Sequence, residues 1–394
     1  MASGPGHWLD DLRQRADQRE QAGLRRALRP RTPGDGVTDL AGNDYLGLSR
    51  HPSVIAAAAA ALSEYGLGAT GSRLVRGSTG LHADLEAGLA GLLGAEAALV
   101  YSSGFLANVG AVRALAGPGT LLVSDRYNHA SIVDGCRGSG ADVVVAPHAD
   151  VAAVEDLLAR RGDRPAVVVT ESVFSVDGDL APLPALHAAC RRYGAVLLVD
   201  DAHAVGVLGP RGAGGVAAAG LSGQPDVVVT ATLSKAFGAA GGVVAGPREL
   251  IAHLVDTGRT FIYDTALPPA VAAGALAALA LIVDGDPLRE QLAERAALVG
   301  KRLVDLDVTE PAAAVVSVAA PGPQQAVAWA AACREWGVAV GCFRPPSTPD
   351  GRSRLRLTMN MGVPRDAFEA ALDVIADCAP ASPVSQARGV SLDP

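Results

Sequence analysis

Short runs of β-branched and aliphatic residues alternate with helical segments from residue 50 to about residue 283. The runs lie at residues 98–100, 121–123, 143–145, 167–169, 196–199 and 227–229. Apolar runs without polar alternation are typical of strands that are buried on both faces of a sheet. Strands separated by helices indicate βαβ units, so the sequence predicts an α/β fold with a mostly parallel, doubly wound sheet.

After Gly285 the pattern becomes that of an α+β domain. We expect strands over residues 314–318, 338–343 and 355–358, and helices near 324–336 and from 365 onward. The predicted organisation is an N-terminal helical arm (1–49), a large α/β domain (50–283), a smaller α+β C-terminal domain (284–379) and a Pro/Ser-rich flexible tail (380–394).

Composition and charge restrict the class of protein. A hydrophobic content of 49% with 19% charged residues is typical of a compact globular chain. The net charge of −8 argues against a nucleic-acid partner or an anionic membrane partner. The five cysteines include no CxxC pair, which is typical of reduced thiols. The N-terminus shows no apolar signal-peptide core, and no alanine-rich run is long enough to cross a bilayer. We therefore expect a cytoplasmic protein.

Lys235 is one of only two lysines in a chain that has 31 arginines. It follows the apolar run 227–229 and precedes glycine-rich sequence, which places it at a strand end that faces open space. A desolvated lysine can lose its proton and attack a carbonyl group, whereas arginine stays protonated. A surface lysine fits the position equally well when it is considered alone.

Asp200 follows the apolar run 195–199, and ligands of open α/β sheets bind at the carboxyl ends of such strands. A carboxylate beside a pyridine nitrogen keeps that nitrogen protonated. Together, Asp200 and Lys235 provide the pyridinium partner and the Schiff-base lysine of a pyridoxal phosphate (PLP) site. Asp200 with Asp201 could instead bind Mg²⁺ or cap a helix. The pairing with Lys235 favours PLP, and we predict no metal site.

The segment 66–71 matches the G-x-G-x-x-G pattern of dinucleotide-binding proteins. That fingerprint requires a strand before the glycines and an acidic residue on the next strand. Here an alanine-rich helix is expected before the glycines, and Asp84 and Glu86 fall within a helical stretch. A dinucleotide-binding oxidoreductase is therefore disfavoured.

Seven motifs occur in an order that resembles the α-oxoamine synthases, which are PLP-dependent enzymes of fold type I. They lie at residues 43–48, 103–108, 125–131, 172–179, 200–203, 232–235 and 344–346, within a resemblance that extends from about Leu24 to about Ala376. The resemblance implies a PLP-dependent transferase fold, with a large domain and a smaller C-terminal domain. It also implies decarboxylative condensation of an amino acid with an acyl thioester.

The resemblance assigns further residues to the cofactor and to catalysis. Those expected to bind PLP are Gly104, Phe105, His129, Ser175, Asp200, His203, Thr232 and Lys235. His129 is expected to stack on the ring and to act in catalysis with Lys235 and Asp200. A lone histidine in a polar turn is otherwise more often a surface or capping residue, and a serine such as Ser103 is more often a simple helix cap.

The resemblance also implies contacts with the substrates. The residues expected to make them are Arg25, His129, Arg344, Ser347 and Arg356, with Arg356 on the carboxylate of the amino acid. Ser347 stands where the family has threonine, so the hydroxyl group is preserved. The chain resembles most the members that join L-alanine to a pimeloyl thioester of coenzyme A or acyl carrier protein, in biotin synthesis.

Two other kinds of protein fit parts of the sequence pattern. Glycine C-acetyltransferase, 5-aminolevulinate synthase and serine palmitoyltransferase use the same chemistry on other substrates. A non-catalytic pyridoxal-binding regulator usually carries a DNA-binding domain, for which the residues before the core leave no room. The resemblance finally implies a homodimer with its active sites at the interface, where the segment 66–80 completes the site of the partner.

Overall fold

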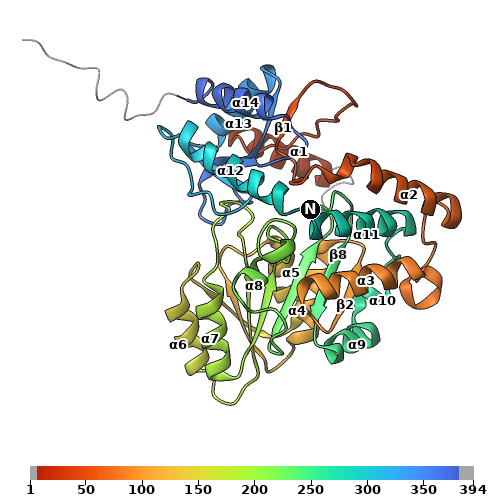
Figure 1. Ribbon diagram of the computed structural model, residues 1–394. Coiled ribbons are helices and arrows are strands. Elements are labelled where there is room, and N and C mark those ends of the chain that lie inside the picture. The colour runs from red at the N-terminus through yellow and green to blue at the C-terminus, as the bar shows by residue number, and fades with distance from the viewer. Residues whose placement is uncertain (1–6, 381–394) are drawn as a thin grey trace, which may run out of the picture.

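The computed structural model describes residues 7–380, which form a seven-stranded sheet and a four-stranded sheet, both flanked by helices (Figure 1). The large sheet has the order β2-β8-β7-β6-β5-β3-β4. Its strands are β2 (Ala97–Tyr101), β3 (Leu121–Asp125), β4 (Asp142–Ala146), β5 (Ala166–Glu171), β6 (Val196–Asp200), β7 (Val227–Thr232) and β8 (Gly242–Gly246). All six apolar runs predicted as strands lie in this sheet, so the prediction of its α/β class is confirmed.

β8 is the strand that the sequence did not predict. It pairs antiparallel with both β2 and β7, whereas the pairs of β3 with β4, β3 with β5, β5 with β6, and β6 with β7 are parallel. Gly242 and Gly246 bound only two β-branched residues, Val243 and Val244. Glycine has low strand propensity, and tertiary packing between two neighbours overrides it here.

Helices cover both faces of the large sheet. The helices within residues 7–302 are α1 (His7–Gln21), α2 (Pro52–Tyr65), α3 (Gly80–Leu93), α4 (Gly104–Leu115), α5 (Ala130–Ser139), α6 (Val151–Ala159), α7 (Leu183–Tyr193), α8 (Gly215–Ala218), α9 (Arg248–Thr257), α10 (Arg259–Ile262), α11 (Pro269–Val283) and α12 (Asp286–Arg302), and α1 is not among those that cover the sheet. Neighbouring residues of one strand point to opposite faces, so Leu197 and Val199 pack in one hydrophobic core while Leu198 packs in another. One core includes α4, α5, α9 and α10, and the other includes α3, α6, α7 and α11.

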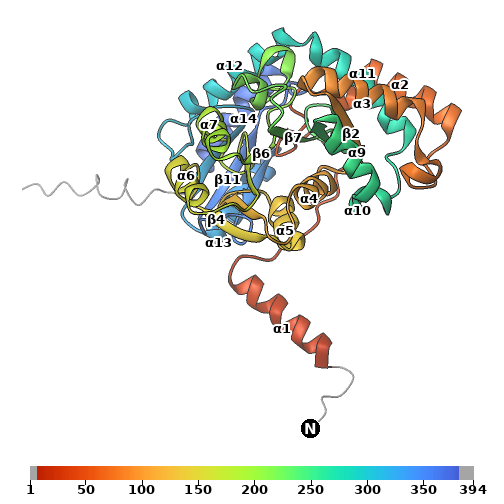
Figure 2. The ribbon, with the colours of Figure 1, turned by 90° about the horizontal axis from the view of Figure 1, so that it is seen from below.

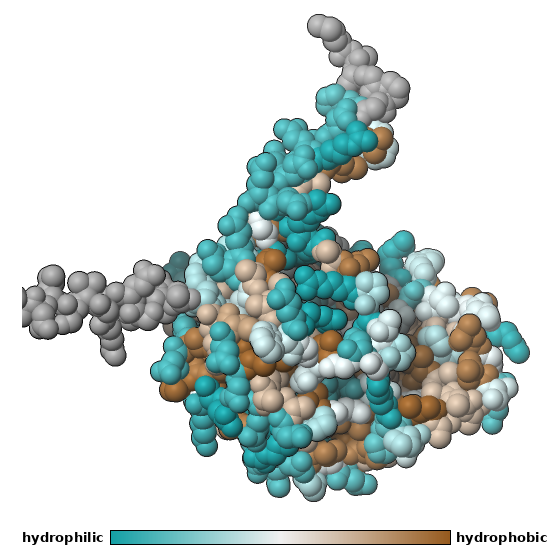
Figure 3. Space-filling model, turned by 90° about the horizontal axis from the view of Figure 1, so that it is seen from above, coloured by the Kyte–Doolittle hydropathy of each residue, from teal (hydrophilic) through white to brown (hydrophobic). Residues whose placement is uncertain are grey.

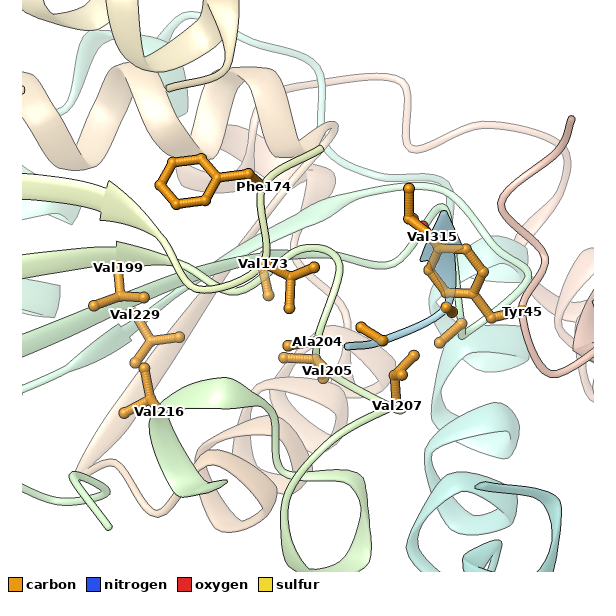
Figure 4. Close-up of a cluster of buried hydrophobic side chains, with 14 of the residues drawn as sticks. Tyr45, Val173, Phe174, Val199, Ala204, Val205, Val207, Val216, Val229 and Val315 are labelled. Atoms are coloured by element: carbon orange, nitrogen blue, oxygen red, sulfur yellow. The ribbon is translucent and has the colours of Figure 1, made fainter. Parts of the chain in front are cut away.

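The core that includes α3, α6, α7 and α11 continues from the large sheet to the smaller domain. Figure 4 shows Val199 and Val229 of the large sheet at one end of this cluster, and Val315 and Tyr45 at the other. Tyr45 is fully buried, although it lies in the N-terminal part of the chain. Because this apolar packing is continuous, the smaller domain is held firmly against the strand ends of the large one.

The smaller sheet has the order β1-β10-β11-β9 and packs against α13 (Pro323–Glu335) and α14 (Arg365–Asp377). Its strands are β1 (Thr38–Leu40), β9 (Val315–Ala320), β10 (Val338–Phe343) and β11 (Ser353–Thr358). Three strands and two helices match the predicted elements. β1 was not predicted; it pairs parallel with β10, so part of the N-terminal region belongs to this sheet.

The helix α1 extends away from the body of the molecule (Figure 2), and none of its residues is buried by the rest of residues 7–380. Figure 3 shows it as a mostly hydrophilic arm with apolar side chains along one side. Trp8, Leu9 and Leu12 supply exposed apolar surface there. The division into arm and domains stays a prediction, and almost all of the predicted tail lies outside the described residues.

Candidate active site

A cavity of about 270 Å³ lies at the carboxyl ends of the parallel strands. It is lined by Ser103, Gly104, Phe105, Asn108, His129, Ser131, Glu171, Asp200, Ala202, His203, Ala231, Thr232, Ser234 and Lys235. Seven of the eight residues predicted to bind PLP are in this lining, and Ser175 lies just beside it. Residues 7–380 contain no group of three or more His, Cys, Asp or Glu side chains that could hold a metal ion.

Lys235 and Asp200 reach this cavity from neighbouring strands. Asp200 is the last residue of β6 and pairs in register with Thr230 of β7, and Lys235 lies three residues after the end of β7. Burial lowers the pKa of Lys235 to about 8, although the carboxylates of Asp200 and Glu171 raise it. A lowered pKa gives Lys235 a larger fraction of neutral, nucleophilic amine near neutral pH than an exposed lysine has.

A chain of hydrogen bonds runs from Lys235 into the core. The Nζ atom of Lys235 lies 2.6 Å from Nε2 of His203, and Nδ1 of His203 lies 2.7 Å from the hydroxyl of Tyr45. That hydroxyl donates to Oδ1 of Asn43 at 3.2 Å, so its oxygen accepts from Nδ1–H of His203. This network leaves Nε2 as the acceptor for the amine. Burial and the nearby cations, Lys235 foremost, hold the pKa of His203 well below its usual range, so the ring is neutral.

Asp200 is held by a buried amide that the sequence analysis did not single out. Nδ2 of Asn108 donates to Oδ2 of Asp200 at 2.6 Å, and the backbone N–H of Ala202 donates to Oδ1 at 3.0 Å. Oδ1 of Asn108 accepts from the hydroxyl of Thr230 at 2.5 Å. The same amide also donates to Ser131 at 2.9 Å. With both oxygens bonded, the carboxylate has a fixed orientation at the cavity wall.

His129 caps α5 in the loop after β3, and Glu171 is the last residue of β5. Nδ1 of His129 lies 2.7 Å from the hydroxyl of Ser131, and burial lowers the pKa of His129 although Asp200 raises it. Oε2 of Glu171 accepts from the backbone N–H of Ser175 at 3.1 Å, while its buried Oε1 has no hydrogen-bond partner among residues 7–380. Burial and the charge of Asp200 hold the pKa of Glu171 well above its usual range.

The amino end of α4 points at the cavity. Ser103 caps the helix, with its hydroxyl accepting from the N–H of Leu106 at 3.3 Å. A Cβ atom added at Gly104 would lie 3.1 Å from Oγ1 of Thr232, so glycine allows this close approach of the helix to β7. Unpaired N–H groups at a helix start bind phosphate well. Phe105 is 45% exposed beside them.

Arg356 approaches from β11 of the smaller sheet. Its guanidinium donates to the carbonyl of Ser175 at 2.8 Å and to Oδ1 of Asn43 at 3.1 Å, and it lies 4.4 Å from the centroid of the Phe343 ring. Nε is buried and has no hydrogen-bond partner within residues 7–380. Asn43 thus joins Arg356 to the hydrogen-bond chain of Lys235.

The remaining predicted substrate residues lie together at a second place, where the N-terminal arm meets the loop after β10. The guanidinium of Arg344 donates to the carbonyl oxygens of Gly23 and Arg25. Ser347 accepts from Arg26 at 2.7 Å, whereas the exposed side chain of Arg25 pairs with Glu20. A cleft of about 170 Å³ is lined here by Arg26, Arg344 and Ser347.

Comparison with known proteins identifies the family. Residues 35–375 match the family model for aminotransferase class I and II. The chain belongs to this family. Its relatives include proteins from Mycolicibacterium gilvum and Mycolicibacterium smegmatis, both named 8-amino-7-oxononanoate synthase and both 54% identical. The matches cover 95% of this chain in both cases, and 97% and 96% of the respective relatives.

Solved structures agree with the sequence matches. Serine palmitoyltransferase from S. paucimobilis, determined with bound PLP and myriocin, superposes with a TM-score of 0.89 at 29% identity, covering 95% of this chain and 98% of that one. An 8-amino-7-oxononanoate synthase from Francisella tularensis superposes with a TM-score of 0.75 at 27% identity, covering 87% and 98%. The fold predicted from the resemblance, that of a PLP-dependent transferase of fold type I, is confirmed.

Proposed function

We propose that the chain is a PLP-dependent acyltransferase that condenses L-alanine with a pimeloyl thioester, releases CO₂ and the thiol carrier, and makes 8-amino-7-oxononanoate for biotin biosynthesis. The observation that carries the proposal is the placement of Lys235 and Asp200 on neighbouring strand ends over one cavity. Relatives 54% identical over 95% of the chain bear the name of this synthase. The serine palmitoyltransferase structures are 29–30% identical, so the 54% identity of the synthase relatives supports the alanine reaction over that alternative.

The residues around the cavity fit PLP. The amino end of α4 and the hydroxyl of Thr232 suit a phosphate group, and Gly104 lets the two approach each other. Asp200 would hold the ring nitrogen protonated, His129 would lie against the ring, and His203 with Ser175 would surround the ring hydroxyl. The buried, unpaired Oε1 of Glu171 adds a polar group that a cavity without a polar ligand would not need.

PLP, when bound, supplies a reactive aldehyde and a ring that withdraws electrons from the α-carbon of an amino acid. Lys235 has the lowered pKa, about 8, that lets Nζ hold and release a proton near neutral pH. Asn108 orients Asp200 through the 2.6 Å hydrogen bond, and Tyr45 orients His203 through the 2.7 Å contact.

Arg356 is the residue that we assign to the carboxylate of L-alanine. Among residues 7–380 its Nε donor has no hydrogen-bond partner, and a planar fork can bind a carboxylate through two hydrogen bonds. Arg25, Arg344 and Ser347 are assigned to the acyl substrate. The end of a pimeloyl group opposite the thioester is a free carboxylate, and the cationic cleft at the N-terminal arm offers this carboxylate opposite charge.

A product assay tests this proposal directly. The purified chain is supplied with PLP and with L-alanine, glycine or L-serine in parallel, each with pimeloyl-coenzyme A and with pimeloyl-acyl carrier protein. We expect CO₂ release and 8-amino-7-oxononanoate with L-alanine. Faster CO₂ release with glycine or L-serine would assign the chain to another α-oxoamine synthase, and no condensation by PLP-loaded protein would contradict the proposal.

We further propose a homodimer in which the segment 66–80 completes the site of the partner subunit. Leu67 and Val75 are 84% and 83% exposed in the single chain, which is unusual for side chains of this size. The segment is attached to the rest of the chain by Arg73, whose guanidinium forms a largely buried ion pair with Glu86 at 2.8 Å. An anchored segment that presents apolar side chains is suited to a subunit interface.

Subunit mixing tests the composite site. A Lys235→Ala chain is combined with an Arg76→Ala chain, and subunit exchange is verified with differently tagged subunits. Random exchange makes half of the dimers hybrids with one intact site, so recovery approaches about a quarter of normal activity. Absence of recovery after verified exchange would show that each chain builds its site alone.

A further inference from the structure

His148 lies between two carboxylates, outside the cavity described above. Its Nδ1 is 3.0 Å from Oδ1 of Asp125, and its Nε2 is 2.8 Å from Oδ2 of Asp179. The ring of Tyr127 stacks on the imidazole with centroids 4.1 Å apart and planes inclined by 14°. Phe174 packs edge-on at 4.4 Å. Position, plane and both hydrogen bonds of this ring are therefore fixed.

Both ring nitrogens face carboxylate oxygens, which accept and do not donate hydrogen bonds. Only the imidazolium form can donate to both. Burial lowers the pKa of His148, but the hydrogen bonds and charges of Asp125 and Asp179 raise it to about 9. Since the pKa is raised, the cation is present at neutral pH, and the two ion pairs are lost as the pH rises through about 9.

The two carboxylates belong to the two segments that supply His129 and Ser175. Asp125 ends β3, four residues before His129, and accepts from the backbone N–H groups of Tyr127 and Ala149, both at 2.7 Å. Asp179 follows Ser175 by four residues, in a turn closed by the hydrogen bond from the N–H of Phe174 to its carbonyl. His148, two residues after β4, is the bridge between these segments.

We propose that His148 is a positioning residue that holds the His129 segment and the Ser175 segment at the spacing required for cofactor binding and condensation. The inference rests on the proposed function. Both segments reach the site beyond the bridge: His129 lines the cavity, and Ser175 donates to Glu171 and accepts from Arg356. Loss of the bridge lets the two segments move apart, and with them the groups on either side of the cofactor.

The other carboxylates near the bridge are paired with an arginine. Asp177 and Asp350 both pair with Arg354, at 3.0 and 2.7 Å. Tyr127 is the remaining titratable group against the ring, and burial raises its pKa above the usual value. Asp125 and Asp179 thus carry the electrostatic contacts that face His148.

The test compares His148→Gln with His187→Gln in full-length protein. His187 is a matched control, because it is buried and pairs with Asp226 at 3.1 Å before the amino end of β7, away from the cavity. The dissociation constant of PLP is measured by equilibrium dialysis at pH 7 and pH 10, together with kcat/KM for L-alanine at pH 7. At pH 7 we expect His148→Gln to bind PLP at least tenfold more weakly than the unsubstituted chain and to lose about 10- to 100-fold in kcat/KM.

The PLP dissociation constant of His148→Gln divided by that of the unsubstituted chain should fall toward one at pH 10, because the unsubstituted chain has then lost the imidazolium too. Titration of Lys235 is common to both proteins and cancels in this ratio. His187→Gln should show a ratio near one at both pH values. Asp179→Asn provides a second variant should His148→Gln fail to fold, with the same direction expected. The inference would be overturned if either folded variant bound PLP at pH 7 with an affinity within twofold of the unsubstituted chain. An unsubstituted chain that binds PLP but makes no product would instead count against the proposed function alone.

Discussion

Gly178 is the point where the turn that carries Ser175 touches the smaller domain. Its backbone has φ +76°, and an added Cβ would lie 2.8 Å from the carbonyl carbon of Val315 and closer still to its oxygen. The same turn is bonded to the smaller domain through the hydroxyl of Thr309, which donates to the carbonyl of Asp177 at 3.0 Å. Gly178→Ala must therefore shift either the turn or β9.

The magnitude follows from two separable effects. A non-glycine residue in the left-handed region costs about 1–2 kcal/mol, and the forced displacement of packed backbone adds about 1–3 kcal/mol. Gly162 is a matched control, because its φ is +68° but an added Cβ meets no described atom within 4 Å. Gly162→Ala should therefore lose about 1–2 kcal/mol in free energy of unfolding, and Gly178→Ala about 2–5 kcal/mol.

Urea-induced unfolding of both variants measures this difference, and kcat/KM for L-alanine reports the displacement of Ser175 and its contact with Arg356. We expect a loss of about 10- to 100-fold in kcat/KM for Gly178→Ala and little change for Gly162→Ala. Equal stability of the two variants, within about 0.5 kcal/mol, would refute the claim that close packing against Val315 fixes the turn.

Three further predictions concern the cavity. Asn108→Ala removes one hydrogen bond to a carboxylate and two neutral ones, so it should lower the free energy of unfolding by about 3–5 kcal/mol and abolish turnover. The control is Asn128→Ala, because Asn128 is equally buried but makes two neutral hydrogen bonds. It should lower the free energy of unfolding by about 1–3 kcal/mol and keep more activity. Asp200→Asn should retain PLP but lose about 100-fold or more in kcat, because an amide cannot hold the ring nitrogen protonated; a near-normal kcat would show that the carboxylate is structural. Because burial lowers the pKa of Lys235 to about 8, the rate of PLP attachment to the apoprotein should rise with pH and level off above about pH 8. Stopped-flow absorbance measures this rate, and a rate that still rises steeply at pH 10 would contradict the lowered pKa of Lys235.

The sequence predicted the parts of the fold that depend on local pattern. Every apolar run named in the large domain is a strand, and strands covered on both faces leave an uninterrupted apolar signature. The expectation of burial on both faces was wrong for the run 143–145, because β4 is an edge strand on which Val143 and Val145 are exposed. β8 and β1 escaped prediction for a different reason. β8 is rich in glycine, and β1 is three residues long and pairs with residues about 300 positions later, so neither has a local pattern that marks it.

The candidate site likewise contains some residues that a local sequence pattern marks and others that none marks. Lys235 and Asp200 could be found because a reactive residue type follows a buried strand in each case. Asn108 and Tyr45 could not, since their importance lies in hydrogen bonds to Asp200 and His203 that form only after folding. Arg26, which contacts Ser347, and Arg25 are neighbours in a run of arginines, and no sequence pattern separates them.

The central claim is that PLP is held covalently by Lys235, and the composition of the chain makes one measurement decisive. The chain has two lysines, and the other, Lys301, is exposed near the end of α12. The purified protein is loaded with PLP, reduced with borohydride, digested and mapped by mass spectrometry. The predicted result is a single pyridoxyl group on the peptide containing Lys235, which Lys235→Arg abolishes. Label on Lys301 alone, or no label on protein reconstituted with PLP, would contradict the claim.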